Sequence, residues 1–296
     1  MRISVTGKAG QVVTSLIERG SADGHEVIAL GRPELDLADP ASAVRVLEAA
    51  APDAIVSAAA YTAVDIAESE RDLAHAVNGA GAGAVAKAAK TLGVPLVHIS
   101  TDYVFDGTLT RPYVESDPTG PTSVYGASKL AGEQTVLATY GDNSAVLRVA
   151  WVYSPFGANF VKTMLRLARD RDEVSVVADQ LGNPTSALDI ADSIIRVATN
   201  MVSNRYPELR GVFHMTARGE ASWADFAEAI FTASAARGGP SARVKRITTA
   251  DYPTPAKRPA NSRLNCSLIA KVHGAVLPDW HQSLEGVMAR LQPAAA

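Results

Sequence analysis

Two kinds of segment alternate along the first half of the chain. Short apolar runs have the length of buried strands, and longer Ala-rich segments between them predict helices. The predicted strands are residues 3–6, 26–30, 54–60 and 95–100; the predicted helices include residues 40–50 and 73–92. Gly93 follows the second helix, as a residue that commonly ends one. This alternation predicts a doubly wound parallel sheet.

After Arg148 the chain enters what we interpret as a second, smaller α/β region. Its expected helices and strands are residues 160–169, 174–177, 189–201, 212–216, 221–235 and 283–291, with a Pro-rich loop at 247–265 and a free tail at 293–296. We therefore predict an α/β fold with a Rossmann-like doubly wound sheet. The dinucleotide-binding domain is expected at residues 1–148, with a return of the chain near 174–214, and a smaller C-terminal α/β substrate-binding region at 149–296.

Composition narrows the class of protein. The 296 residues carry a net charge of −3 and the sequence pI is about 6.1, which disfavours nucleic acid or an anionic membrane as the main partner. The N-terminus lacks the layout of a signal peptide, and acidic residues interrupt every long apolar run. Cys266 is the only cysteine, which excludes an internal disulfide and a cysteine-rich zinc site. We expect a cytoplasmic protein.

The first strand runs into a glycine turn and then a helix, the context that a dinucleotide-binding motif requires. Gly7 would permit the tight turn, and Gly10 would let a diphosphate approach the helix N-terminus. Val13 stands at the third glycine position, where we expect it to widen the helix–strand contact and weaken cofactor binding. The alternative is a strand–turn–helix unit that binds no nucleotide.

The second strand indicates which cofactor is used. It ends at Gly31-Arg32, with no acidic residue at its tip to bind a ribose 2′-hydroxyl. Arg32 suits a 2′-phosphate, so we predict NADPH, with NADH possible; the alternative is a solvated loop arginine. Asp36 is the candidate for contacting adenine. The small residues Ala58, Ala59 and Ala60 end the third strand and leave room for a flat ring system.

Tyr125 and Lys129 are the candidate catalytic pair. Four residues apart on a helix, their side chains lie on one face, about 6 Å apart along the axis. A neighbouring ammonium favours phenolate, so we expect Lys129 to lower the pKa of Tyr125 and make it a usable proton donor to a carbonyl oxygen. Thr101, delivered by the strand at 95–100, could hold the same oxygen. The alternative is a partly exposed Tyr–Lys pair without function.

Four motifs together are similar to one enzyme family, and further matches extend the similarity over nearly the whole chain. The motifs are Gly7-Lys8-Ala9-Gly10-Gln11, Ala58-Ala59-Ala60-Tyr61-Thr62-Ala63-Val64-Asp65, Ser100-Thr101-Asp102-Tyr103-Val104-Phe105-Asp106-Gly107 and Tyr125-Gly126-Ala127-Ser128-Lys129. The further matches are Trp151-Val152-Tyr153, Asn159-Phe160, Gly182-Asn183-Pro184-Thr185 and Arg258-Pro259-Ala260-Asn261-Ser262. The chain resembles the dTDP-4-dehydrorhamnose reductases, which belong to the extended short-chain dehydrogenases.

The resemblance implies reduction of the 4-keto group of dTDP-4-dehydro-L-rhamnose to dTDP-L-rhamnose with NAD(P)H, the last step of dTDP-rhamnose synthesis. The implied catalytic residues are Thr101, Tyr125 and Lys129. With the candidates above, the cofactor site is expected to comprise Gly7, Gly10, Gln11, Val12, Arg32, Asp36, Leu37, Ala58, Ala59, Ala60, Tyr61, Thr62, Tyr125 and Lys129. The dTDP-sugar is expected to contact Val64, Thr101, Asp102, Tyr103, Tyr125, Trp151, Asn159, Arg258 and Asn261. Core packing is an equally weighted alternative for Trp151.

The Pro-rich loop contains three cations, Lys257, Arg258 and Arg263, which could bind the diphosphate of a nucleotide. The alternative is an ordinary exposed basic loop.

Two departures from the family pattern are Val13 and Ser57, which stands where the family usually has Asn. A third bears on assembly: some members dimerise around a metal held partly by an acidic residue on the first helix, where this chain has Ser15. We therefore expect no metal and a monomer or weak homodimer.

Rival functions remain within the same superfamily. An NDP-sugar epimerase or another reductase would share the catalytic residues, whereas a dehydratase needs an Asp-Glu pair after the threonine. Here Asp102 is followed by Tyr103. A non-catalytic regulatory subunit, similar to the β subunit of methionine adenosyltransferase, is the remaining alternative.

Overall fold

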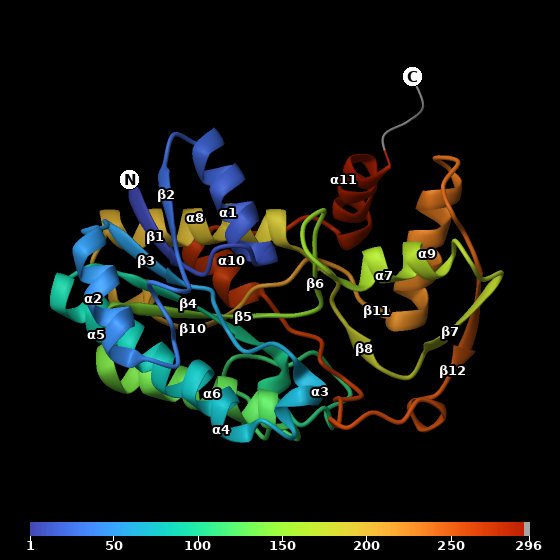
Figure 1. The fold of residues 1–296 in the computed structure, drawn as a ribbon, viewed down its shortest axis with the longest axis horizontal. Coiled ribbons are helices and arrows are strands. Elements are labelled where there is room, and N and C mark those ends of the chain that lie inside the picture. The colour runs from blue at the N-terminus through green and yellow to red at the C-terminus, as the bar shows by residue number, and fades with distance from the viewer. Residues whose placement is uncertain (293–296) are drawn as a thin grey trace.

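A six-stranded parallel sheet forms the centre of the larger of two lobes (Figure 1). The structure is a computed structural model that describes residues 1–292, so the tail expected at 293–296 lies outside the described residues. The strand order is β10-β5-β4-β3-β1-β2, and every neighbouring pair is parallel. The strands are β1 (Arg2–Thr6), β2 (Glu26–Leu30), β3 (Ala54–Ser57), β4 (Leu96–Thr101), β5 (Ser144–Val149) and β10 (Gly211–His214). The predicted doubly wound fold is confirmed.

Helices cover both faces of this sheet because both faces of its strands are apolar. In β3, Ala54 and Val56 belong to one core cluster and Ile55 to the other. One face carries α1 (Gln11–Ala22), α8 (Ala187–Ser203) and α10 (Ser267–His273); the other carries α2 (Pro40–Ala50), α5 (Ala82–Leu92) and α6 (Val124–Tyr140). Within residues 1–292, none of the helices is long and apolar enough to cross a bilayer.

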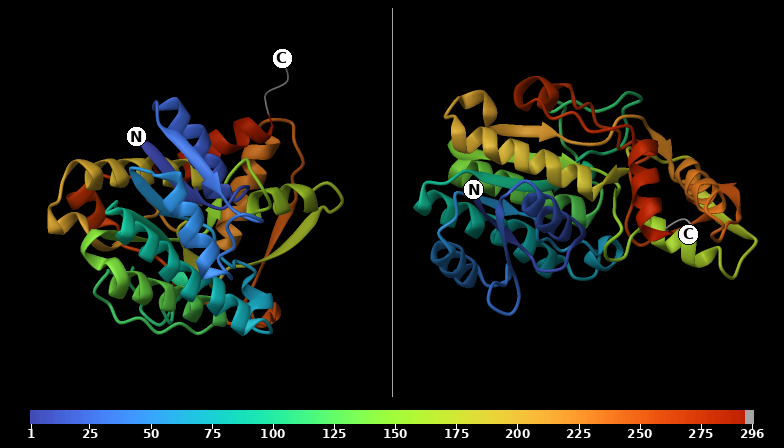
Figure 2. Two further views of the ribbon diagram at one scale, coloured as in Figure 1. Left: turned by 60° about the vertical axis from the view of Figure 1, so that its left-hand side comes forward. Right: turned by 90° about the horizontal axis from the view of Figure 1, so that it is seen from above.

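The smaller lobe has its own apolar core and a two-stranded parallel sheet (Figure 2). Its main elements are α7 (Phe160–Leu167), β7 (Glu173–Val177), α9 (Trp223–Ala235), β12 (Arg243–Ile247) and α11 (Trp280–Leu291). Two short pairs lie at its boundary with the sheet: β6 (Val152–Tyr153) with β9 (Thr185–Ser186), and β8 (Leu181–Gly182) with β11 (Ala221–Ser222). Of the segment at 174–214, α8 and β10 pack into the larger lobe, whereas β7 pairs with β12.

Some element boundaries differ from the sequence prediction. The helix expected at residues 73–92 consists of α4 (Arg71–His75), the π-helical segment η1 (Ala76–Gly81) and α5, and α3 (Val64–Ala67) precedes it. Gly93 ends α5 in the left-handed conformation, as predicted. The third strand ends at Ser57, so the alanines after it lie in a loop. β12 was not predicted, because three of its five residues are Arg or Lys.

Candidate active site

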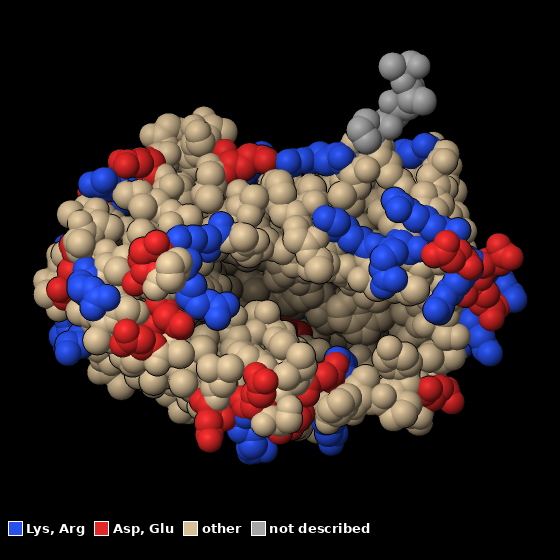
Figure 3. All heavy atoms as spheres, in the orientation of Figure 1, with Lys and Arg blue, Asp and Glu red and all other residues tan. Residues whose placement is uncertain are grey.

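The candidate site lies where the winding of the large sheet changes direction. β1 has β2 on one side and β3 on the other, so the chain turns in opposite directions from adjacent strands. Ligands of doubly wound sheets bind at the carboxyl ends of such strands. The loops after β1, β3 and β4 meet there, and Figure 3 shows a hollow between the two lobes at this place.

The turn after β1 fits a dinucleotide diphosphate. Gly7 has a φ of +104°, which side chains rarely adopt, and Gly10 caps α1 without a side-chain hydrogen bond to the helix. Gly10 is exposed and has no side chain to block the first N–H groups of α1, and such free N–H groups at a helix N-terminus bind anions. Thr6 accepts hydrogen bonds from the N–H groups of Ala58 and Ala59, both at 3.0 Å, and so joins this turn to the loop after β3.

Val12 and Gln11 begin α1, and Gln11 connects it to the smaller lobe. Its Oε1 accepts hydrogen bonds from Ser154 at 2.7 Å and Asn159 at 3.0 Å, and its Nε2 donates to the carbonyl of Val152 at 3.3 Å. Asn159 also caps α7, so its side chain links three segments of protein. Its predicted contact with substrate stays a prediction.

The adenosine end of the expected cofactor site is richer in charge than the sequence suggested. Arg32 is exposed after the end of β2. Lys8, whose side chain lies against the neighbouring Gly31, forms an ion pair with Glu34 at 2.5 Å. Lys8 holds the pKa of Glu34 below its usual value. Asp36 accepts a hydrogen bond from the N–H of Ala38, and Leu37 is buried. Lys8 follows Gly7 and Glu34 lies two residues after Arg32, but their pairing was not predicted because it joins loops 26 positions apart in the chain.

Asn78 holds together two segments of the site and was not recognised from the sequence. It is buried in η1, accepts from the N–H of Tyr61 at 2.8 Å and donates to the Tyr61 carbonyl at 3.0 Å and to Ser128 at 2.9 Å. Ser128 precedes Lys129, so Asn78 ties the loop after β3 to the catalytic helix α6. Thr62, also predicted to line the cofactor, follows Tyr61 and is exposed; Ala60 before it is half-buried.

Thr101, Tyr125 and Lys129 lie at the end of β4 and on the facing side of α6. The Thr101 hydroxyl donates to Asp102 at 2.9 Å and contacts the hydroxyl of Tyr125. Lys129 is buried and its Nζ donates to the carbonyl of Ile99 at 2.6 Å. The structure therefore brings the three predicted catalytic side chains to one place.

The pKa values at this place follow burial. Burial raises the pKa of Tyr125 to about 12, and the contact with Thr101 only partly opposes it. The expectation that the pKa of Tyr125 is lowered is therefore wrong, because desolvation of the phenolate is the largest effect and raises it. Burial also lowers the pKa of Lys129 to about 8, with the carboxylate of Glu133 opposing the shift, and raises that of Asp102 to about 6.

Aromatic side chains line the part of the site expected to hold substrate. The ring of Tyr103 meets that of Tyr125 edge-on, with ring centres 5.8 Å apart. Val64, another predicted substrate contact, begins α3 and is half-buried. Trp151 is half-buried, has a φ of +46° and stacks flat on Trp223 at 3.6 Å. Trp223 was not predicted, because nothing near it in the sequence carries a motif. Its ring gives Trp151 a packing partner while leaving it partly exposed.

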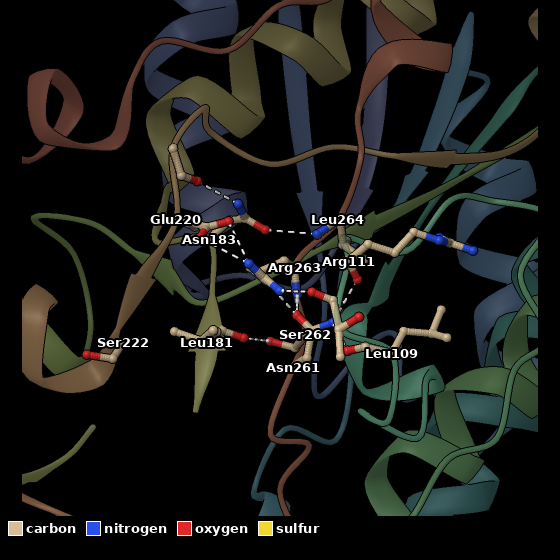
Figure 4. A network of polar contacts seen from close by, with 12 residues as sticks. Leu109, Arg111, Leu181, Asn183, Glu220, Ser222, Asn261, Ser262, Arg263 and Leu264 are labelled. Carbon is tan, nitrogen blue, oxygen red and sulfur yellow. Dashed lines mark hydrogen bonds and ion pairs between the residues drawn. The ribbon is translucent and has the colours of Figure 1, made fainter. Parts of the chain in front are cut away.

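The Pro-rich loop joins the two lobes through ion pairs and hydrogen bonds. Arg258 binds both carboxylate oxygens of Asp65, at 3.1 and 2.8 Å, so its guanidinium already has an anionic partner. Asn261 donates to the carbonyls of Leu109 and Arg111, and its oxygen accepts from Arg263 (Figure 4). Both predicted substrate contacts stay predictions, and the structure gives each side chain a role within the protein.

The three departures from the family pattern are accommodated within the core. Val13 is buried, and one of its methyl groups lies 3.2 Å from where a Cβ on Gly7 would be, so it fills the space left by that glycine. Ser57 bonds to the ring of His98 at 3.0 Å. Ser15 is fully buried in α1. Among residues 1–292, no three His, Cys, Asp or Glu side chains gather as potential metal ligands.

Comparison with known proteins identifies relatives over the whole chain. The family model described as the RmlD substrate binding domain matches residues 1–292. The dTDP-4-dehydrorhamnose reductase of Sinorhizobium fredii is 52% identical over 283 residues, which cover 96% of this chain and 95% of that protein. The enzyme of the same name from Escherichia coli K12 is 40% identical over 300 residues, with 98% of each chain covered.

Solved structures agree. A dTDP-4-dehydrorhamnose reductase from Clostridium acetobutylicum superposes with a TM-score of 0.91 at 36% identity, covering 99% of this chain and all of that one. The Bacillus anthracis enzyme, solved in complex with NADP, superposes with a TM-score of 0.89 at 35% identity, covering 97% and 98%. The resemblance read from the sequence motifs is confirmed: this chain belongs to the dTDP-4-dehydrorhamnose reductase family.

Proposed function

We propose that the protein reduces the 4-keto group of dTDP-4-dehydro-L-rhamnose to give dTDP-L-rhamnose, with NADPH as the cofactor. The observation that carries this proposal is the meeting of Thr101, Tyr125 and Lys129 at the same edge of the sheet as the glycine turn of β1, in a chain that aligns over nearly its full length with reductases of that name. A relative solved with NADP supports the choice of cofactor.

Tyr125 is the proton donor in this proposal. With a pKa of about 12 it carries its proton throughout the neutral range, as a general acid must. When bound, the reduced nicotinamide supplies the hydride. Tyr125 gives its proton to the sugar oxygen on which negative charge develops, and Thr101, whose hydroxyl contacts that of Tyr125, holds the same oxygen. Lys129 places a positive charge behind them, where it favours the anionic oxygen.

The cofactor and the sugar nucleotide would meet at the hollow between the lobes. The N-terminus of α1 at Gly10 would hold the diphosphate of the cofactor, and Arg32 together with Lys8 would face its 2′-phosphate. The exposed part of Trp151 and the ring of Tyr103 offer apolar surface to a 6-deoxy sugar, which has a methyl group where other hexoses have a hydroxymethyl group. These residue assignments are part of the proposal.

A direct assay tests it. Purified protein, NADPH and dTDP-4-dehydro-L-rhamnose should yield NADP and dTDP-L-rhamnose, followed by loss of NADPH absorbance and by mass and NMR spectra of the product. Presenting other dTDP-4-keto-6-deoxysugars in parallel defines the preferred substrate. Tight binding of NADPH and sugar nucleotide without turnover would refute the proposal and favour a regulatory subunit. Epimerised but unreduced sugar would favour an epimerase.

A further inference from the structure

A buried ion pair lies directly behind the catalytic residues. Glu133 on α6 is 2% exposed and Arg148 on β5 is 4% exposed, with three hydrogen bonds between them at 2.8, 3.0 and 3.3 Å. Burying two charges costs desolvation energy, and apolar residues of similar size often stabilise a fold as well or better. The position of the pair therefore calls for an explanation beyond stability.

Glu133 links the two elements that carry the catalytic groups, because it lies on α6 and its carboxylate binds β4. Glu133 lies one turn after Lys129 on α6, and it accepts a hydrogen bond from the hydroxyl of Ser100, the residue before Thr101 on β4. Lys129 in turn donates to the carbonyl of Ile99, the residue before Ser100. Two successive residues at the end of β4 are thus fixed to two successive turns of α6. Shifting Glu133 would move Thr101 relative to Tyr125 and Lys129.

Arg148 completes the cluster around the Glu133 carboxylate. Its guanidinium lies 5.0 Å from the ring centre of Phe105 and 3.5 Å from the ring of His214. These contacts orient the arginine and leave the Glu133 carboxylate shared between Arg148 and Ser100.

We propose that Glu133 is a positioning residue for the reduction, which holds α6 against the end of β4 and places a carboxylate one helical turn from Lys129. The inference rests on the proposed function in that the cation of Lys129 is taken to assist proton donation by Tyr125. It assigns the buried pair to catalysis through Lys129 rather than to folding alone.

The charges around Lys129 agree with this role. On β4, burial and the positive charge of Lys129 hold the pKa of His98 well below its usual value, so that ring is neutral. Beyond Arg148, His214 on β10 has a pKa of about 3 and is neutral too. Tyr125 is protonated, and Asp102, after β4, has a pKa of about 6. The Glu133 carboxylate is the charge that raises the pKa of Lys129 against the effect of burial.

The sign of the expected effect follows. Lys129 is charged below its pKa of about 8, and activity that needs the cation falls as the pH rises through that value. Removing the carboxylate takes away an opposite charge, so the pKa of Lys129 falls further and the alkaline limb of the activity profile moves to lower pH.

The test substitutes Glu133→Gln, which keeps the shape and can still accept from Ser100. In protein labelled with ¹³C-lysine, the titration of Lys129 is followed at its Cε, with Lys129→Met identifying the signal. We expect Lys129 to titrate about one pH unit lower than in the wild type. The alkaline limb of kcat in the presence of NADPH should move by a similar amount, while the Kd for NADPH at neutral pH stays within about twofold. An unchanged titration in the folded variant would overturn the proposal.

The double variant Glu133→Gln/Arg148→Met separates charge from packing, because it removes the guanidinium that the single variant leaves unpaired. We expect the double variant to recover thermal stability while Lys129 still titrates below the wild-type value. Wild-type titration of Lys129 in the double variant would overturn the proposal, and it decides the matter even where the single variant does not fold. The NMR titration needs no turnover, so it remains informative if the wild-type enzyme fails to reduce the proposed substrate.

Discussion

The catalytic edge of the large sheet and the aromatic face of the smaller lobe are built in opposite ways. At the edge, Lys129, Asn78 and Glu133 are buried polar groups, each with hydrogen bonds to groups distant in the sequence. On the opposite face, Trp151 is positioned by stacking on Trp223 and stays partly exposed. Hydrogen bonds fix atoms to fractions of an ångström, whereas stacking tolerates sliding. Proton donation needs the precise placement that hydrogen bonds give, whereas recognition of a sugar nucleotide can use stacking.

This comparison predicts that substitutions at the edge change kcat and that substitutions on the aromatic face change KM. Tyr125→Phe is the strongest test, because it removes the proton donor and keeps the ring. We expect kcat to fall by roughly 10²- to 10⁴-fold, the usual contribution of general acid catalysis, with unchanged thermal stability. Steady-state kinetics with NADPH and the 4-keto sugar nucleotide measure it. Near-normal turnover would show that another group donates the proton.

Val13→Gly tests the packing beneath the edge. The sequence suggested that this valine weakens cofactor binding, but it is buried beside Gly7 and fills space there. Its loss should leave a cavity and add a poor helix former, lowering the free energy of unfolding by about 3 kcal/mol. Denaturant unfolding measures this, with Val13→Ala as the matched control that keeps helix propensity and should lose less. Tighter NADPH binding without loss of stability would revive the original expectation.

Trp223→Ala tests the aromatic face. Without its stacking partner, Trp151 should lose its fixed orientation, and we expect KM for the sugar nucleotide to rise by about tenfold or less, with kcat little changed. Trp223→Phe keeps an aromatic ring and should recover part of the affinity. A fall in kcat equal to the loss in kcat/KM would mean that Trp223 acts on the transition state, and the contrast between the two regions would then fail.

The same contrast explains what the sequence could predict. β2 and α2 have the predicted bounds, and the glycine turn, Thr101, Tyr125 and Lys129 carry short motifs whose chemistry can be read from neighbouring residues. Asn78 and Glu133 carry no such motif, because their roles depend on Ser128 and Ser100, which lie 50 and 33 positions away in the chain. The raised pKa of Tyr125 was not predicted for a related reason: the helical spacing shows that Lys129 is near, but it does not show how deeply the Tyr125 side chain is buried.

The π-helical segment η1 shows why continuity of a helix is equally hard to predict. The alanines at 73–92 favour a continuous helix, but the wider turn at Ala76–Gly81 contains the weak helix formers Asn78, Gly79 and Gly81. That turn contains Asn78, whose side chain meets Tyr61 and Ser128. β12 was not predicted because its sequence lacks an apolar run: its arginines and lysine face solvent at the edge of the smaller lobe.

The smallest expected effect concerns the choice between NADPH and NADH. Arg32 is exposed at the end of β2, so its interaction with a 2′-phosphate is screened by water, and Lys8 offers a second cation next to it. We expect Arg32→Ala to lower the NADPH/NADH ratio of kcat/KM by about tenfold or less, equivalent to about 1.4 kcal/mol or less.

Glu34→Gln is the matched variant with the opposite expected effect. It removes the carboxylate that pairs with Lys8 and that repels phosphate, so it should raise the NADPH/NADH ratio. Ratios measured for the wild type and both variants at two salt concentrations complete the test, since screening should shrink both effects. A wild-type preference for NADH, or equal ratios in all three proteins, would show that neither cation reads the 2′-phosphate.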